Sequence, residues 1–212
     1  WLAVAAILFG SILALAQDDL KKMLTYLIVA EVGYMVGGFW LATANGITGA
    51  ILHIVNDALM TFCLFVFAGI VVYKTGGHKL SDLQGFYRKM PVTMAAFTVG
   101  ALSMIGVPPT AGFFSKWYLI LGAIDGGSYH YMAALLISSL VNAILFFRVI
   151  EIAYFEPRVD HHADHGPDIT ISEAPFSMLA PLLIVAICLI IIGLYSGTIV
   201  TNIIQYSVPP GM

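Results

Sequence analysis

Long apolar runs alternate with short polar stretches along this chain. The runs are continuous and do not alternate in polarity, which favours helices over the strands of a barrel. A helix also satisfies every backbone amide within its own segment, as a lipid environment requires. The pattern predicts seven helices, at about residues 2–16, 23–42, 48–73, 91–108, 110–124, 131–155 and 176–204, with a tight turn at Asn45–Gly46.

The composition supports a membrane environment for these helices. Hydrophobic residues make up 60% of the 212 residues and charged residues 10%, and the mean hydropathy is +0.94. Soluble domains carry about 25% charged residues. The chain therefore reads as an all-α, polytopic membrane bundle with the lipid bilayer as a partner. The net charge of −3 and the lack of a basic tail give no indication of a nucleic-acid partner.

Four ionisable side chains lie inside the predicted helices. Such a group near the bilayer centre costs at least about 2.5 kcal/mol, so its position is informative. Glu31 lies in the middle of the second helix, and His53 and Asp57 share a face of the third at a spacing of four, where they can hydrogen bond or exchange a proton. Lys116 follows the helix-breaking pair Pro108–Pro109, and transporters place ion sites beside such breaks. The four groups predict a hydrated polar line able to pass protons.

Each of these positions also has a structural interpretation. Glu31 can be a protonated acid that cross-links helices, and His53 with Asp57 can join helices by hydrogen bonds. Lys116 can extend to an interface because its segment is short, and Arg148 reads as an interface anchor. His161, His162, Asp164 and His165 resemble metal ligands in composition only, so no metal site is predicted.

The distribution of Lys and Arg predicts an orientation. Six basic residues fall in the loops after the first and third segments, and Arg158 falls on the opposite face; the six are Lys21, Lys22, Lys74, Lys79, Arg88 and Lys89. The face with six is predicted to be cytoplasmic. The chain begins at Trp1 without a basic leader or cleavage site, so we expect an internal start in a longer polypeptide.

Several stretches resemble the antiporter-like subunits of Mrp-type cation/proton antiporters, complex I and membrane-bound hydrogenases, and their wording is closest to the D-type subunits of Mrp antiporters. The likeness covers about residues 9–155. It is carried by QDDLKKMLTY at residues 17–26, by the His-containing helix at residues 49–69, by GFYRKMP at residues 85–91 and, most specifically, by GALSMIGVPPTAGFFSKW at residues 100–117.

This resemblance implies a fold of two inverted five-helix repeats, each with a broken helix that carries a central charge. Residues 1–16 would be the last helix of a first repeat, residues 23–155 the second repeat, residues 156–174 a polar loop and residues 176–205 a closing helix. Residues 110–124 would be the broken helix, giving about seven membrane helices of which one is broken. Lys116 would be its lysine, and the supporting residues would be Lys21, Lys22, Tyr26, Asn56 and Arg148. Asp57, Thr61 and Glu31 depart from the family, which usually has His, Lys and His or Gln there.

The resulting hypothesis is a proton, or coupled Na⁺/H⁺, translocation subunit of a multisubunit complex in a bacterial or archaeal inner membrane. Its partners would be other membrane subunits, H⁺ and, in a coupled antiporter, Na⁺. The alternatives are an antiporter-like subunit of a complex I-type or hydrogenase complex, and a non-conducting structural subunit. A membrane enzyme is weakly supported, because no paired nucleophile and base stand out. No cofactor is predicted, since the sequence has no Cys motif and no glycine-rich dinucleotide turn.

Overall fold

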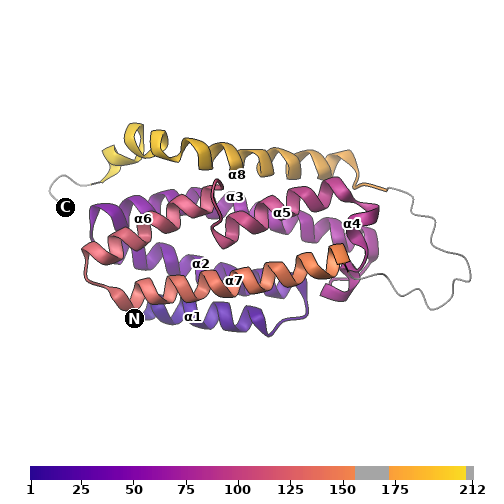
Figure 1. Ribbon diagram of the computed structural model, residues 1–212, viewed down its shortest axis with the longest axis horizontal. Helices are drawn as coiled ribbons and strands as arrows, with labels where there is room; N and C mark the ends of the chain where they lie inside the picture. The colour runs from indigo at the N-terminus through magenta and orange to yellow at the C-terminus, as the bar shows by residue number, and fades with distance from the viewer. Residues whose placement is uncertain (156–171, 209–212) are drawn as a thin grey trace, which may run out of the picture.

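The computed structural model of the chain describes residues 1–155 and 172–208, and all seven apolar segments are helices. They lie roughly parallel to one long axis (Figure 1). This arrangement confirms the predicted all-α membrane bundle. Its helices are α1 (Leu2–Leu15), α2 (Leu20–Trp40), α3 (Ala44–Thr75), α4 (Phe86–Lys89), α5 (Pro91–Ile105), α6 (Ala111–Asp125), α7 (Tyr129–Phe155) and α8 (Phe176–Asn202), with 3₁₀ turns η1 (Leu80–Leu83) and η2 (Ile204–Ser207).

Polar residues at the ends of the apolar runs set the helix bounds. The Asp19 carboxylate accepts hydrogen bonds from the first-turn amides of α2, and the Thr43 hydroxyl does the same for α3. Pro91 occupies the first turn of α5, where its missing N–H costs nothing. The predicted tight turn at Asn45–Gly46 is wrong, because both residues lie in the first turn of α3. The chain reverses earlier, where Ala42 has a φ of 50°.

Four helices are long and apolar enough to cross a membrane: α2, α3, α7 and α8, with 21 to 32 residues each. At about 1.5 Å per residue each reaches the roughly 30 Å of a bilayer core. Their outward side chains are large and apolar, as at Leu140, Ile184 and Leu194, which are 60–63% exposed. An apolar outer surface of this kind matches lipid tails rather than water.

Helices α5 and α6 lie end to end and together make one crossing (Figure 1). Each has 15 residues, or about 22 Å, which is too short to span a bilayer alone. The chain between them opens at Gly106, which has a φ of 93°, and continues through Pro108–Pro109. The broken helix therefore includes both segments, whereas the sequence pattern predicts it for residues 110–124 alone. The division into residues 1–16 and 23–155 as parts of two repeats stays a prediction.

Counting α5 and α6 as one crossing changes the topology. The Ser172 amide donates to the Lys89 carbonyl at 2.9 Å, and Lys74 Nζ donates to the Ser172 hydroxyl at 3.1 Å. Residues 172–174 therefore lie at the same end of the bundle as the basic loops, and their predicted place on the opposite face is wrong. We call this end the basic end; it holds every Lys and Arg of the described residues except Lys116. Arg158 lies outside the described residues.

Two apolar clusters fill the bundle, one toward each end. The larger includes stacked Phe67 and Phe97, whose ring centroids are 4.1 Å apart, together with Phe146. The smaller is built around Tyr34 and Leu119. Along α2, α3, α6 and α7 the residues of one cluster give way to those of the other near mid-helix. Between them lies a layer of buried polar side chains.

Candidate functional site

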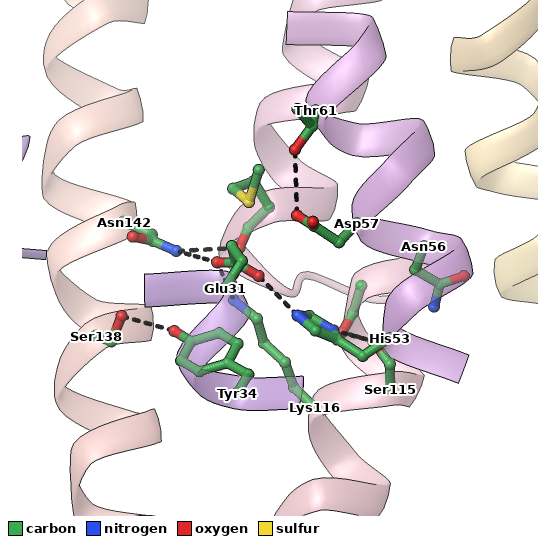
Figure 2. Close-up of polar contacts among 12 residues, drawn as sticks. Glu31, Tyr34, His53, Asn56, Asp57, Thr61, Ser115, Lys116, Ser138 and Asn142 are labelled. Atoms are coloured by element: carbon green, nitrogen blue, oxygen red, sulfur yellow. Dashed lines mark hydrogen bonds and ion pairs between the residues drawn. The ribbon is translucent and has the colours of Figure 1, made fainter. Parts of the chain in front are cut away.

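A buried polar cluster occupies the middle of the bundle, and each of its four main residues comes from a different helix (Figure 2). Glu31 lies on α2, His53 on α3, Lys116 on α6 and Asn142 on α7. The exposed fraction is 0% for the first two and for Asn142, and 5% for Lys116. Three of the four residues predicted for the proton path, Glu31, His53 and Lys116, therefore meet at one place.

Glu31 is the centre of this cluster. Its Oε2 atom lies 2.8 Å from His53 Nε2, a hydrogen-bonding distance. Its Oε1 atom accepts a hydrogen bond from Asn142 Nδ2 at 3.3 Å and lies 3.9 Å from Lys116 Nζ. The carboxylate is thus paired with the lysine without a hydrogen bond between them. A buried charge of this kind is tolerated because opposite charge and donors surround it.

Lys116 connects the two halves of the broken helix. Its Nζ donates to the Met104 carbonyl, at the end of α5, at 2.6 Å and lies 5.0 Å from the ring centroid of Tyr34. The last carbonyls of a helix lack intrahelical partners and carry a partial negative charge, which favours a cation. The ammonium group therefore sits where the break exposes an acceptor, between that carbonyl, an aromatic face and the Glu31 carboxylate.

His53 connects Glu31 to Ser115, and this contact allows two proton arrangements. His53 Nδ1 lies 2.9 Å from Ser115 Oγ, which is also 3.1 Å from the Gly112 carbonyl. A serine hydroxyl has one proton to donate. If it donates to Gly112, His53 Nδ1 must carry a proton; if it donates to His53, Nδ1 is bare and Nε2 donates to Glu31. The same heavy-atom geometry thus accommodates a proton at different positions.

Asp57 lies one turn along α3 from His53, toward the basic end, and is 8% exposed. It accepts a hydrogen bond from the Thr61 hydroxyl at 3.2 Å. The expected direct contact between His53 and Asp57 is wrong, because both ring nitrogens of His53 are occupied by Glu31 and Ser115. A role for Asp57 on a proton path stays a prediction.

The predicted supporting residues lie away from this cluster. Asn56 donates to the Ala111 carbonyl at 2.8 Å and ties α3 to the first turn of α6. Arg148 pairs with Asp18 at 3.0 Å on the surface of the basic end. Tyr26 packs against the larger apolar cluster, and Lys21 and Lys22 are exposed at the start of α2. The group His161, His162, Asp164 and His165 lies outside the described residues.

Sequence reasoning missed the neutral members of the site. It gave no role to Ser115, to the Met104 carbonyl or to the contacts of Asn142. A second polar chain was missed as well: Tyr34 donates to the Ser138 hydroxyl at 2.6 Å, and Ser138 contacts Ser11 at 2.5 Å. Ser138 and Asn142 are four residues apart in an apolar run, so they share one helix face. This spacing is the signal that could have located them.

Glycines bring the helices into contact at the break. A Cβ atom on Gly112 would overlap the Ser103 carbonyl of α5, and one on Gly193 of α8 would overlap the Pro109 carbonyl. Only a residue without a side chain permits these approaches. The position of Lys116, four residues after Gly112, therefore depends on close backbone packing.

The fold and the buried cluster define a class, that of membrane proteins with ionisable groups gathered at a broken helix. The chain belongs to the NADH:quinone oxidoreductase/Mrp antiporter transmembrane family, which matches residues 1–142. It is 46% identical, over 99% of its length, to 43% of an NADH-quinone oxidoreductase subunit N from Desulforudis audaxviator. It is 28% identical to the subunit of the same name from Brevibacillus brevis, over 99% of its length and 39% of that protein.

Solved structures with the same fold come from several membrane complexes. A chain of an archaeal membrane-bound sulfane sulfur reductase matches with a TM-score of 0.84 and 27% identity, over 96% of this chain and 40% of that one. A chain of Thermus thermophilus respiratory complex I matches with 0.73 and 26%, over 94% and 44%. A chain of the Mrp complex from Dietzia shares the fold, with 0.84 and 21%, over 93% and 44%. The chain spans about two fifths of the length of the curated relatives it matches.

Proposed function

We propose that this chain translocates protons within a multisubunit membrane complex, through Lys116, Glu31 and His53. The observation that carries the proposal is the place of Lys116, which donates to the Met104 carbonyl at the helix break while its Nζ lies 3.9 Å from Glu31. A movement of about 1 Å brings the ammonium within hydrogen-bonding distance of the carboxylate. A proton can then pass to Glu31 and on to His53, with water filling the remaining gaps.

The family contains more than one kind of complex, and we favour the NADH-quinone oxidoreductase kind. The 46% identity to a curated subunit N supports this choice over the D-type Mrp subunits that the sequence motifs resemble most. The Mrp type is the alternative, supported by the fold shared with the Dietzia complex. A purely structural subunit, for which Thr61 in place of the usual lysine spoke, is a weaker proposal because Glu31 and Lys116 form an ion pair in the buried layer.

We further propose that the basic end faces the cytoplasm. Seven Lys and Arg residues of the described chain lie there, and Lys116 is the one described lysine or arginine elsewhere. Cytoplasmic loops carry an excess of such residues. The proposed location is the cell membrane, with other membrane subunits as partners, since the matched structures are multisubunit membrane complexes.

The test is proton uptake into membrane vesicles that contain the assembled complex, driven first by NADH oxidation and then by a sodium gradient. The variant is Lys116→Ala and the matched control is Lys89→Ala, which removes an exposed lysine at the basic end. Both are compared at equal subunit abundance. We expect Lys116→Ala to abolish uptake and Lys89→Ala to retain it. The effective driving force indicates the kind of complex.

A second variant separates lost conduction from misfolding. Lys116→Ala alone leaves the Glu31 carboxylate buried without its cation, which is strongly destabilising. The double variant Glu31→Gln, Lys116→Ala removes both charges and avoids that penalty. If the double variant assembles normally and does not translocate protons, the loss lies in the path. Normal uptake in both variants would refute the proposal.

A further inference from the structure

Asn142 shares both acceptors of Lys116. Its Nδ2 donates to Glu31 Oε1 at 3.3 Å and to the Met104 carbonyl at 3.4 Å (Figure 2). Lys116 Nζ lies 3.9 Å from the first of these oxygens and 2.6 Å from the second. The amide and the ammonium thus converge on the same two oxygens from α7 and α6.

The two donors differ in how they respond to a proton. The number of N–H donors on a lysine falls when the group is deprotonated, and they move with the side chain. A primary amide has two N–H donors and no charge, and it keeps both. Asn142 is therefore a constant donor beside the variable donor Lys116.

The orientation of the amide supports this interpretation. Asn142 Oδ1 is buried and has no hydrogen-bond partner in the described part of the chain. An unpaired buried acceptor is unfavourable. Turning the amide over would set that oxygen against the Glu31 and Met104 oxygens, which is worse. The contacts with those two acceptors therefore fix the NH₂ group toward the cluster.

We propose that Asn142 is a positioning residue, which holds the Glu31 carboxylate and the Met104 carbonyl in place while the Lys116 ammonium moves between them or gives up its proton. The inference rests on the proposed proton translocation. Without Asn142, each departure of the ammonium would leave a buried oxygen with one donor fewer. Glu31 would keep only His53, and Met104 none of the two side-chain donors it now has.

The experiment compares two replacements in vesicles with the assembled complex. Asn142→Leu removes the amide and keeps the approximate size. Asn142→Asp keeps the shape and replaces the NH₂ donor by an oxygen, so it donates only when the introduced carboxyl group is protonated. The ionisable groups around it are Glu31 and Tyr34 of α2, His53 and Asp57 of α3 and Lys116 of α6; α1 and α5 carry no ionisable side chain.

The two replacements should differ in their dependence on pH, which a merely structural role would not produce. We expect Asn142→Leu to lower proton uptake about tenfold, by a similar factor from about pH 6 to about pH 9. Asn142→Asp should come within about threefold of the native rate at the acidic end, and fall about tenfold or more below it at the alkaline end. The control is Ser138→Ala, which removes a buried polar group of α7 that contacts Tyr34 and Ser11.

Three results would overturn the inference. The first is uptake by Asn142→Leu within about twofold of the native rate. The second is a deficit of Asn142→Asp that does not change with pH. The third is a Ser138→Ala deficit with the same pH dependence as that of Asn142→Asp. If Lys116→Ala loses uptake while one of these results holds, only the role of Asn142 fails; if Lys116→Ala translocates normally, the proposed function fails with it.

Discussion

Replacing Gly112 by alanine should disable the site without touching a charged group. Gly112 lies in the first turn of α6, and its amide donates to the Ser103 hydroxyl at 3.2 Å. A Cβ atom there would overlap the Ser103 backbone carbonyl, far inside the normal carbon–oxygen separation. Backbone atoms cannot rotate away, so α6 must move by more than about 1 Å before the distance approaches about 3.5 Å.

The size of the effect follows from what α6 carries. Overpacking of a close contact costs about 1–3 kcal/mol. A shift of about 1 Å also takes the 2.6 Å bond from Lys116 Nζ to the Met104 carbonyl beyond hydrogen-bonding range, which ends near about 3.2 Å. A hydrogen bond to a charged group contributes about 1.5–3 kcal/mol, so its loss at the working position corresponds to about tenfold to a hundredfold in rate.

Two other helical glycines provide matched controls. A Cβ atom on Gly197 of α8 would meet nothing within 4 Å, and one on Gly69 of α3 only the end of Met178 at 3.8 Å. Gly197→Ala and Gly69→Ala should keep or slightly raise stability, by up to about 1 kcal/mol, because alanine is the better helix former. The assays are proton uptake in vesicles and the temperature at which half of the detergent-solubilised complex dissociates. Native uptake and native stability in Gly112→Ala would refute the reasoning on the packing of the break.

Two further predictions concern the basic end. Glu173 accepts from the Val92 amide at 2.7 Å and from the Thr93 hydroxyl at 2.7 Å, so Glu173→Ala should lower stability by about 1–2 kcal/mol. Glu151→Ala, at an exposed position of α7, should change it by less than about 0.5 kcal/mol, and equal dissociation temperatures would contradict this role. A cysteine replacing Ser81 should react with an impermeant maleimide from the cytoplasmic side only, and one replacing Tyr129 from the other side only. Reversed labelling would contradict the orientation.

The helices could be predicted closely because each apolar run ends at a residue with a specific backbone preference. Asp19 and Thr43 cap the starts of α2 and α3, and Gly76, with a φ of 72°, ends α3. The topology could not be read as easily, since a run ending at Pro108–Pro109 looks like a complete helix. Whether two 15-residue helices make one crossing or two depends on their packing against α3 and α8, which is a tertiary property.

The charged residues of the site could be predicted because ionisable groups inside apolar runs are few and costly. Their pairing could not, because it depends on the angle at which α2, α3 and α6 face one another. The spacing of four between His53 and Asp57 favoured a local contact, but Glu31 of α2 lies closer to His53 and occupies its Nε2 atom. A hydrogen bond across helices replaced one along a helix.

The departures from the family pattern fall where the structure gives them partners in common. Glu31 stands where the resemblance leads one to expect His or Gln, and it supplies a carboxylate for Lys116 from α2. Thr61 stands where a lysine is usual, and its hydroxyl donates to Asp57, which also departs from the pattern. With His53 neutral, Glu31 and Lys116 balance each other in the buried layer. The remaining charge, Asp57, lies toward the basic end and is the most exposed of these groups, at 8%. The deepest burial is thus kept for a balanced pair, as the cost of an uncompensated buried charge requires.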